Sequence, residues 1–161
     1  MLGELDVAVL RAFRTRGHTS ARERAVAAFS RLGEQAMLWM ALCAAGAALD
    51  PENRPAYTRA AKTIFATYAC NQLIKAAVRR RRPRLEGLPP LAGTLSGLSY
   101  PSAHAATSFA GARMLSHTLP APPLYATAVG LVLSRLYLGL HYPSDVIAGA
   151  GLGAAIGELA S

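Results

Sequence analysis

The residues best suited to chemistry fall into three clusters between positions 75 and 145, and the first is Lys75-x6-Arg82-Pro83. If a helix ran through this segment, Lys75 and Arg82 would lie two turns apart on one face, and Pro83 would end the helix. Two fixed cations suit the oxygens of a phosphoryl group, and the arginine fork can bind two oxygens at once. The alternative interpretation is a plain basic patch flanking a membrane helix.

The second cluster, Pro101-Ser102-Ala103-His104, opens an apolar block. Proline suits the first turn of a helix, and the free N–H groups of that turn favour an anion. Ser102 would add a hydroxyl donor, and His104 could give a proton to a departing oxygen near neutral pH. The alternative is a capping serine beside a histidine that takes no part in chemistry.

The third cluster is Ser134-Arg135-x5-His141-x3-Asp145. Arg135 falls inside an apolar segment, where an unpaired charge is costly, so it is a candidate functional residue. In helical geometry the carboxylate of Asp145 would reach the ring of His141, select its tautomer and strengthen its other nitrogen as a nucleophile. Pro143 could distort this turn. The alternative is a helix-capping Asp145 beside a histidine at the membrane boundary.

Five apolar blocks must carry these clusters, and they cover residues 26–49, 57–78, 103–119, 123–141 and 145–160. None is a clean run of the roughly 20 apolar residues that cross a bilayer. Small residues nevertheless recur at helix-packing spacing, and Gly149, Gly153 and Gly157 lie four apart. We therefore predict an all-α, integral-membrane helical bundle of about five transmembrane helices in a single domain, residues 1–161. A soluble all-α bundle is the alternative.

Two further segments complete the predicted domain. The N-terminal segment, residues 1–24, contains one apolar helical stripe formed by Leu5, Val9, Ala12 and Phe13. This pattern predicts an amphipathic helix at the membrane interface, and its alternative is a surface helix packed on the core. Residues 79–101 form the longest stretch without a helical pattern, and a long loop in a small domain is typically functional or disordered. We expect this one to be functional.

The amino-acid composition indicates which kinds of molecule the protein can bind. The chain is 52% hydrophobic and 16% charged, with a formal net charge of +8, whereas soluble domains have roughly 25% charged residues. The positive balance suits a phosphorylated substrate or an anionic membrane surface. The high apolar fraction and the lack of a basic-aromatic pattern argue against nucleic acid. Cys43 and Cys70 lie in apolar stretches, so we interpret them as packing residues rather than a zinc site or a disulfide.

In this order, the three clusters resemble the three-part signature of the type-2 phosphatidic acid phosphatase superfamily, which also includes bacterial acid phosphatases and vanadium haloperoxidases. The resemblance covers roughly residues 57–160. One position departs from the pattern, because the family usually has glycine where this chain has Ala103. That position contributes a backbone N–H, which alanine retains, so we expect altered packing rather than lost activity.

The resemblance implies a metal-independent phosphatase that works through a phosphohistidine intermediate. It implies that His141 attacks phosphorus, that His104 protonates the leaving group and that Asp145 orients His141. The residues implied to hold the phosphate are Lys75, Arg82, Ser102, Ala103 and Arg135. Their positive charge would stabilise the transition state as a metal does elsewhere, so no metal site and no cofactor is expected.

The resemblance also implies a lipid phosphate as substrate and a multi-pass location in the bacterial inner (cell) membrane. The candidates are phospholipids, polyprenyl (pyro)phosphates and phospho-sugars on a polyprenyl carrier, as in actinobacterial decaprenyl-phosphoribose phosphatases. Arginines near the N-terminal segment and in residues 79–101 favour a cytoplasm-facing site, whereas family members acting on envelope lipids commonly face outward. The alternatives are a phosphatidylglycerophosphate phosphatase, a haloperoxidase-like enzyme and a non-catalytic lipid-binding protein. The oligomeric state does not follow from the sequence.

Overall fold

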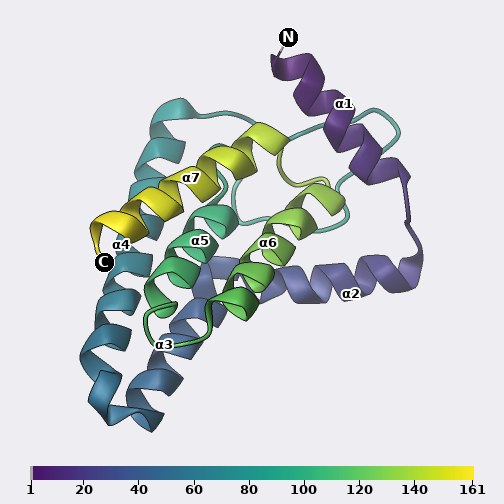
Figure 1. The fold of residues 1–161 in the computed structure, drawn as a ribbon. Helices are drawn as coiled ribbons and strands as arrows, with labels where there is room; N and C mark the ends of the chain where they lie inside the picture. The colour runs from purple at the N-terminus through teal and green to yellow at the C-terminus, as the bar shows by residue number, and fades with distance from the viewer. Residues whose placement is uncertain (1) are drawn as a thin grey trace.

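The computed structural model describes residues 2–161, and within that range the chain is all-helical, as predicted (Figure 1). The α-helices are α1 (Leu2–Thr15), α2 (Ser20–Arg31), α3 (Met37–Leu49), α4 (Arg54–Val78), α5 (Ala103–Leu115), α6 (Ala121–Tyr137) and α7 (Pro143–Leu159). Two short 3-10 helices, Glu34–Ala36 and Pro51–Asn53, precede α3 and α4.

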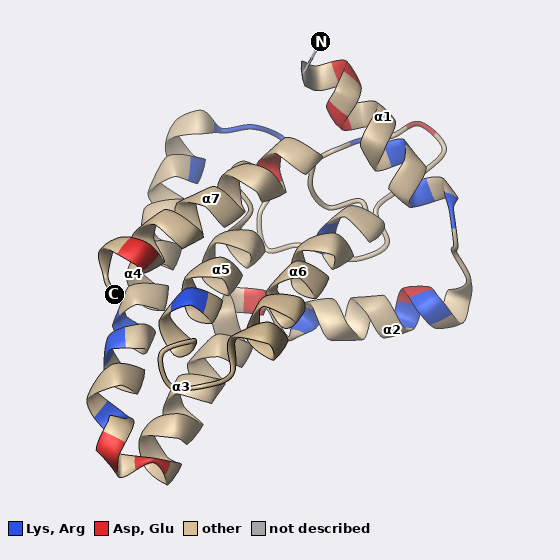
Figure 2. Cartoon of the chain, viewed as in Figure 1, with Lys and Arg blue, Asp and Glu red and all other residues tan. Residues whose placement is uncertain are grey.

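Helix α5 is the centre of the bundle, and α4, α6 and α7 pack around it. It can take this place because its residues are small, and Ala105, Ala106 and Ala110 are fully buried. A second apolar contact region lies where Trp39 of α3 covers Gly111 of α5. Charged residues are densest in residues 79–86, directly after α4, and they also occur on α1, α2 and α4, whereas α3 has none (Figure 2).

The predicted glycine stripe is the surface through which α7 packs on α5. A side-chain carbon added at Gly149 would collide with the carbonyl oxygen of Ser102, and one added at Gly153 would collide with that of Ala106. The close approach of two helix backbones expected from the glycine spacing is therefore confirmed.

Substitution of this stripe should destabilise the fold. Gly153→Ala should cost about 1–3 kcal/mol, because the neighbouring backbone of α5 cannot move aside as a side chain could. Gly151→Ala is the matched control, because a carbon added there meets nothing within 4 Å. Alanine also favours helix over glycine, so the control should be neutral or slightly stabilising. Thermal unfolding of both variants in detergent tests this, and equal melting temperatures would contradict it.

The apolar block 26–49 is not one helix, which corrects the sequence prediction. Helix α2 ends at Arg31, and Gln35 and Ala36 both adopt left-handed backbone angles, with φ of 49° and 61°. The two parts are bent by 48°. Within residues 2–161, no single helix is long and apolar enough to cross a membrane, although the bent pair Ser20–Arg31 and Glu34–Leu49 passes the same criteria together. The number of spans therefore stays a prediction.

The buried residues of helix α1 lie outside its predicted apolar stripe. The buried residues are Asp6, Leu10 and Arg14, whereas Leu5 of the predicted stripe is 60% exposed. Arg14 donates a hydrogen bond of 2.6 Å to the carbonyl of Pro89. Polar contacts and the burial of Leu10 thus fix α1 on the bundle. Within its apolar stripe Leu5 and Ala12 are exposed, whereas Val9 and Phe13 are half-buried.

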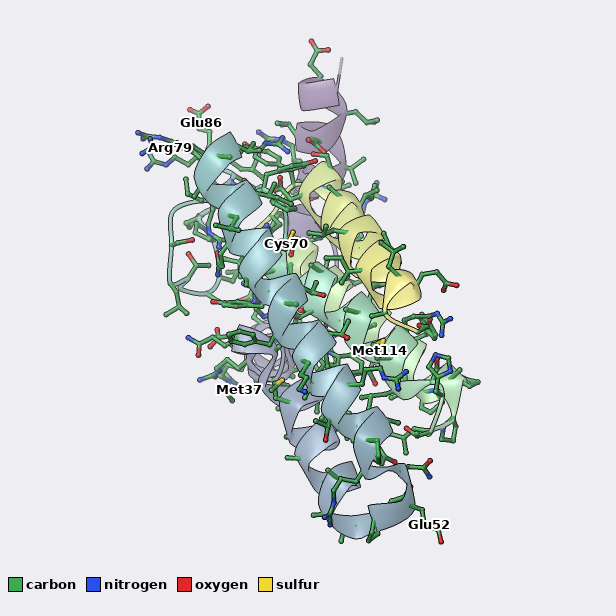
Figure 3. All side chains as sticks on the ribbon, turned by 90° about the vertical axis from the view of Figure 1, so that its left-hand side faces the viewer. Met37, Glu52, Cys70, Arg79, Glu86 and Met114 are labelled. Carbon is green, nitrogen blue, oxygen red and sulfur yellow. The ribbon has the colours of Figure 1, made fainter. Side chains whose placement is uncertain are left out.

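The bundle has two distinct ends. Figure 3 shows Arg79 and Glu86 at one end of α4 and Glu52 at the other. Helix α1 and residues 79–101 share the first end, as the predicted topology requires. The same end holds the three sequence clusters.

Candidate active site

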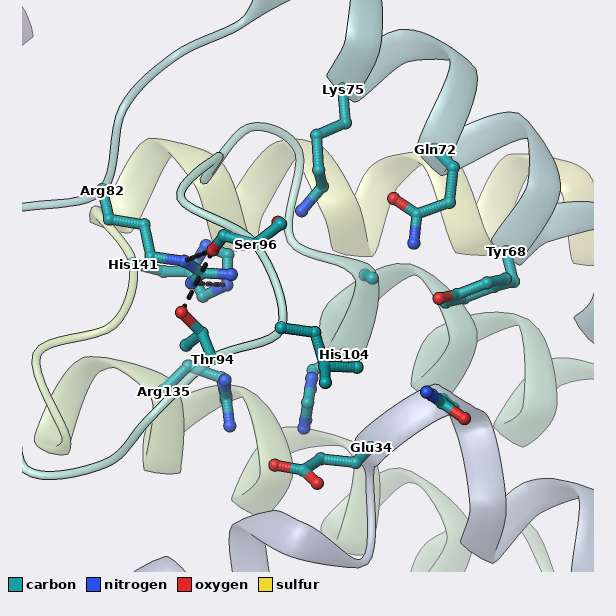
Figure 4. A pocket seen from close by; sticks show the side chains of 13 residues that line it. Glu34, Tyr68, Gln72, Lys75, Arg82, Thr94, Ser96, His104, Arg135 and His141 are labelled. Carbon is teal, nitrogen blue, oxygen red and sulfur yellow. Dashed lines mark hydrogen bonds between the residues drawn. The ribbon is translucent and has the colours of Figure 1, made fainter.

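A half-open pocket of about 120 Å³ lies at the α1 end of the bundle. Its walls come from α4, α5, α6, residues 79–101, the connection between α6 and α7, and the break between α2 and α3. All three clusters contribute to it, through Lys75, Arg82, Ala103, His104, Arg135 and His141 (Figure 4).

Arg82 reaches the pocket from a loop, and the prediction that one helix carries both Lys75 and Arg82 to Pro83 is wrong. Helix α4 ends at Val78 because Arg79 adopts a left-handed conformation (φ 55°) and caps it, its N–H donating to the carbonyl of Lys75. The turn redirects the chain so that Arg82 meets Lys75 across the pocket.

The guanidinium of Arg82 is fixed by three acceptors. Its Nε donates to the carbonyl of Ser96 at 2.8 Å, and one terminal nitrogen donates to the carbonyl of Leu140 at 2.8 Å. The same terminal nitrogen lies 3.0 Å from Nε2 of His141. Because a guanidinium only donates, Nε2 must present its lone pair, and the ring proton must be on Nδ1.

Asp145 lies beside that protonated nitrogen. Its Oδ2 is 3.5 Å from Nδ1 of His141, close enough for charge attraction but too long for a good hydrogen bond. The two residues do not share a helix as expected, because α6 ends at Tyr137 and α7 begins at Pro143. Asp145 instead lies in the first turn of α7, directly after the loop that contains His141.

Burial keeps the His141 imidazole neutral. The side chain is 2% exposed, and desolvation, assisted by the positive charges of Arg82 and Arg135, lowers its pKa to about 3. The negative charge of Asp145 works in the opposite direction and is outweighed. At neutral pH Nε2 therefore carries a lone pair and no proton, and this lone pair accepts the hydrogen bond from Arg82.

His104 is oriented by the end of α2. Its Nε2 lies 3.1 Å from the carbonyl of Ser30, and because a carbonyl only accepts, this nitrogen carries the proton. Gly33 makes room for the ring, since a side-chain carbon there would lie 2.7 Å from Cδ2 of His104. Ser30 and Gly33 belong to no sequence cluster, and their spacing gives no signal of this function.

The cations around the pocket have spare donors. Arg135 is buried and donates a 2.6 Å hydrogen bond to the hydroxyl of Ser30, but its Nε has no partner within residues 2–161. Lys75 makes one long contact, 3.5 Å to the carbonyl of Leu98. We call Lys75, Arg82 and Arg135 the phosphate cradle, because an anion with several oxygens would satisfy these donors together.

Ser102 does not line the pocket. Its hydroxyl accepts a hydrogen bond from the N–H of Ala105 and so caps α5, while its own N–H donates to the carbonyl of Asp145. The structure therefore places this residue as the capping serine of the alternative interpretation. Ala103, at the start of α5, does line the pocket.

Comparison with known proteins agrees with this geometry. A family model described as the PAP2 superfamily matches residues 56–161. The chain belongs to the PAP2 superfamily. A decaprenylphosphoryl-5-phosphoribose phosphatase of Mycolicibacterium smegmatis is 42% identical over 124 residues, which cover 76% of this chain and 68% of that protein. Like its relatives, this PAP2 protein is a phosphatase, and thus a hydrolase.

Two solved structures share the fold of this PAP2 phosphatase. The transmembrane PAP2-type phosphatidylglycerolphosphate phosphatase of Bacillus subtilis has a TM-score of 0.81 and 21% identity, covering 98% of this chain and 83% of its own. LpxE of Aquifex aeolicus has a TM-score of 0.76 and 22% identity, covering 97% and 94%. These similarities establish that the chain has the same architecture as the two PAP2-type phosphatases.

The PAP2 pocket has a second wall that sequence reasoning missed. It faces the phosphate cradle and consists of polar side chains, here called the headgroup wall: Glu34, Gln35, Tyr68 and Gln72. Tyr68 and Gln72 lie one helical turn apart on α4, whereas Glu34 and Gln35 come from the α2–α3 break. No local motif marks these residues, because the two segments meet only through the fold.

Proposed function

We propose that this phosphatase removes the terminal phosphate from a phospho-sugar carried on a polyprenyl lipid, through a phosphohistidine formed at His141. One observation carries the chemistry: the Nε2 lone pair of a neutral His141 lies at the phosphate cradle, in the same pocket as His104. The pocket's small volume suits a phosphate and part of a headgroup, so the lipid tail would stay outside it.

The proposed reaction has two steps. In the first, Nε2 of His141 forms a bond to phosphorus while the bond from phosphorus to the sugar oxygen breaks. His104, protonated on both ring nitrogens once the anionic substrate is bound, gives that oxygen the proton of Nδ1, while its Nε2–H stays on the carbonyl of Ser30. In the second, water attacks phosphorus, His104 takes back a proton, and the phosphorus–nitrogen bond breaks to release inorganic phosphate. The cradle would hold the equatorial oxygens in both steps, while Asp145 stabilises the charge that develops on His141.

The headgroup wall supports a hydroxyl-bearing substrate. Glu34 is a hydrogen-bond acceptor for hydroxyl groups but repels a phosphate, and Gln72 both donates and accepts. The left-handed angles of Gln35 and Ala36 cost energy, and such strain is typically retained at functional sites. The named activity of the Mycolicibacterium relative, on a decaprenyl-linked phosphoribose, is consistent with this chemistry.

Selectivity for the sugar should depend on this wall. Gln72→Leu keeps the side-chain size but removes a donor and an acceptor, so kcat/KM for a polyprenyl phosphoryl-5-phosphoribose should fall about tenfold, the effect of one lost hydrogen bond. Phosphatidic acid, whose headgroup lacks those hydroxyls, should be affected much less. Leu73→Ala is the control, since Leu73 is exposed on the same helix. Equal losses on both substrates would contradict the assignment of the wall.

The decisive experiment for the function uses the purified full chain and a lipid panel. Phosphate release would be measured from polyprenyl phosphoryl-5-phosphoribose, polyprenyl pyrophosphate, phosphatidylglycerol phosphate and phosphatidic acid, with and without EDTA. We expect the phospho-sugar to have the highest kcat/KM and EDTA to have no effect. A preference for another lipid would overturn the substrate proposal, and loss of activity in EDTA would overturn metal independence. Acid-labile, alkali-stable labelling from ³²P substrate would identify the phosphohistidine.

A further inference from the structure

Arg80 joins three separate parts of the chain next to the proposed nucleophile. One terminal nitrogen donates to Oδ1 of Asp145 at 2.8 Å and to the hydroxyl of Ser144 at 2.7 Å. The other donates to Oδ2 of Asp6 on α1 at 2.8 Å. The guanidinium also lies over the ring of Tyr142, 4.2 Å from its centroid. Arg80 is one of the six residues between Lys75 and Arg82 to which the three sequence clusters assign no role.

This arrangement fixes the carboxylate of Asp145. Arg80 holds Oδ1, and the N–H of Tyr142 donates to Oδ2 at 2.8 Å. The side chain is fully buried, so water does not supply competing contacts. Oδ2 is thereby turned toward Nδ1 of His141. Without Arg80, only the contact with Tyr142 would determine how the carboxylate faces the imidazole.

Asp6 fixes Arg80 in turn. Besides the ion pair with Arg80, it accepts hydrogen bonds from both the N–H and the hydroxyl of Ser144. Burial works to raise the pKa of Asp6, but the hydrogen bonds from Arg80 and Ser144 outweigh it and the net shift is downward. Burial likewise opposes the charge of Arg80, and its contacts with Asp6 and Asp145 outweigh that effect to raise its pKa. The pair is therefore ionised throughout the working pH range.

We propose that Arg80 and Asp6 are positioning residues for His141, so that helix α1 belongs to the catalytic unit. Asp6 orients Arg80, Arg80 orients Asp145, and Asp145 orients the imidazole. Hydrogen bonds of 2.8 Å link Asp6 to Arg80 and Arg80 to Asp145, and the 3.5 Å contact between Asp145 and Nδ1 of His141 completes the chain of contacts. This inference rests on the proposed role of His141 and adds to it a requirement for α1.

Two variants of the full chain test the inference. Arg80→Lys keeps the charge but cannot hold two carboxylates and a hydroxyl in one planar fork. Asp6→Asn keeps the size but removes the charge. Because misplacement of a catalytic group can cost up to about 100-fold, we expect kcat to fall about 10- to 100-fold in the first and less in the second, with KM within about twofold. Arg81→Lys, at the neighbouring exposed arginine, is the matched control and should behave as wild type.

A pH profile separates positioning from a general loss of stability. The charged or titratable groups that face His141 are Asp145, Arg82, Arg135, Lys75 and His104. When the Arg80 fork no longer holds Oδ1 of Asp145, the placement of Oδ2 against Nδ1 of His141 changes, and the pKa of His141 changes with it. The acid limb of the kcat profile should therefore move in Arg80→Lys. A merely structural arginine would lower the melting temperature without moving this limb.

Each result has a definite meaning. A lower kcat, an unchanged KM and a shifted acid limb in Arg80→Lys, with a smaller change in Asp6→Asn, would support the inference. Wild-type kcat in both variants, or a rise in KM alone, would overturn it. If Arg80→Lys does not fold, the Asp6→Asn result decides. Full activity of His141→Ala would instead overturn the proposed nucleophile, a failure distinct from that of the positioning residues.

Discussion

Replacing His141 with alanine should reduce phosphate release from every substrate by about a thousandfold or more. In the proposed mechanism this residue supplies the attacking atom, since its unprotonated Nε2 lies beside Arg82 of the phosphate cradle. Loss of a nucleophile typically removes nearly all of the catalytic enhancement, leaving what binding and charge stabilisation provide. The measurement is single-turnover phosphate release from purified protein in detergent, together with loss of ³²P labelling on acid-labile protein.

His117→Ala is the matched histidine control. His117 is exposed and contacts Arg113, away from the pocket. It should retain wild-type activity and label normally. A His141→Ala protein that melts at the wild-type temperature yet releases phosphate at the wild-type rate would rule out the phosphohistidine mechanism.

Replacing His104 with alanine should affect substrates according to their leaving groups. General acid catalysis contributes about 10²- to 10⁴-fold, so hydrolysis of a sugar phosphate, which expels a poor leaving group, should fall by a factor in that range. A p-nitrophenyl phosphate expels a stable phenolate and needs no proton, so the first step should be far less impaired. The measurement is the burst of p-nitrophenol compared with release from the lipid substrate.

The informative quantity for His104 is the loss of activity on the lipid substrate relative to the loss on p-nitrophenyl phosphate. Asn would preserve part of the contact with the carbonyl of Ser30, so His104→Asn checks whether lost packing explains the result. If aryl and alkyl phosphates lose activity equally in both variants, His104 contributes to phosphate binding and not to protonation of the leaving group.

The sequence predicted which residues line the pocket better than it predicted the backbone conformation that positions them. Spacing and residue type singled out Arg82, His104, Arg135 and His141, because cations and histidines in an apolar chain have few other uses, and all of them line one pocket. The glycine spacing of α7 likewise predicted how it packs on α5. These successes come from signals that are local in the chain, such as periodicity and the cost of burying charge.

The failures arise where tertiary contacts override local preference. The residue types of Arg79, Gln35 and Ala36 do not predict a left-handed conformation, which glycine usually adopts. These residues nevertheless end α4 and break the first apolar block. The Asp6–Arg80 pair joins residues 74 positions apart, beyond the reach of any periodicity. The polar contacts of α1 could not be predicted either, because Asp6 and Arg14 find partners that only the folded chain provides.

The contact between Arg82 and Nε2 of His141 has a consequence for turnover. If His141 is the nucleophile, Arg82 must release Nε2 before this nitrogen can attack a phosphate. The hydrogen bond between Arg82 and His141 thus competes with phosphate for the guanidinium, so a phosphate that makes no other contact in the pocket should bind weakly. Free phosphate, the product, is such a ligand. We therefore expect added inorganic phosphate to inhibit turnover only weakly.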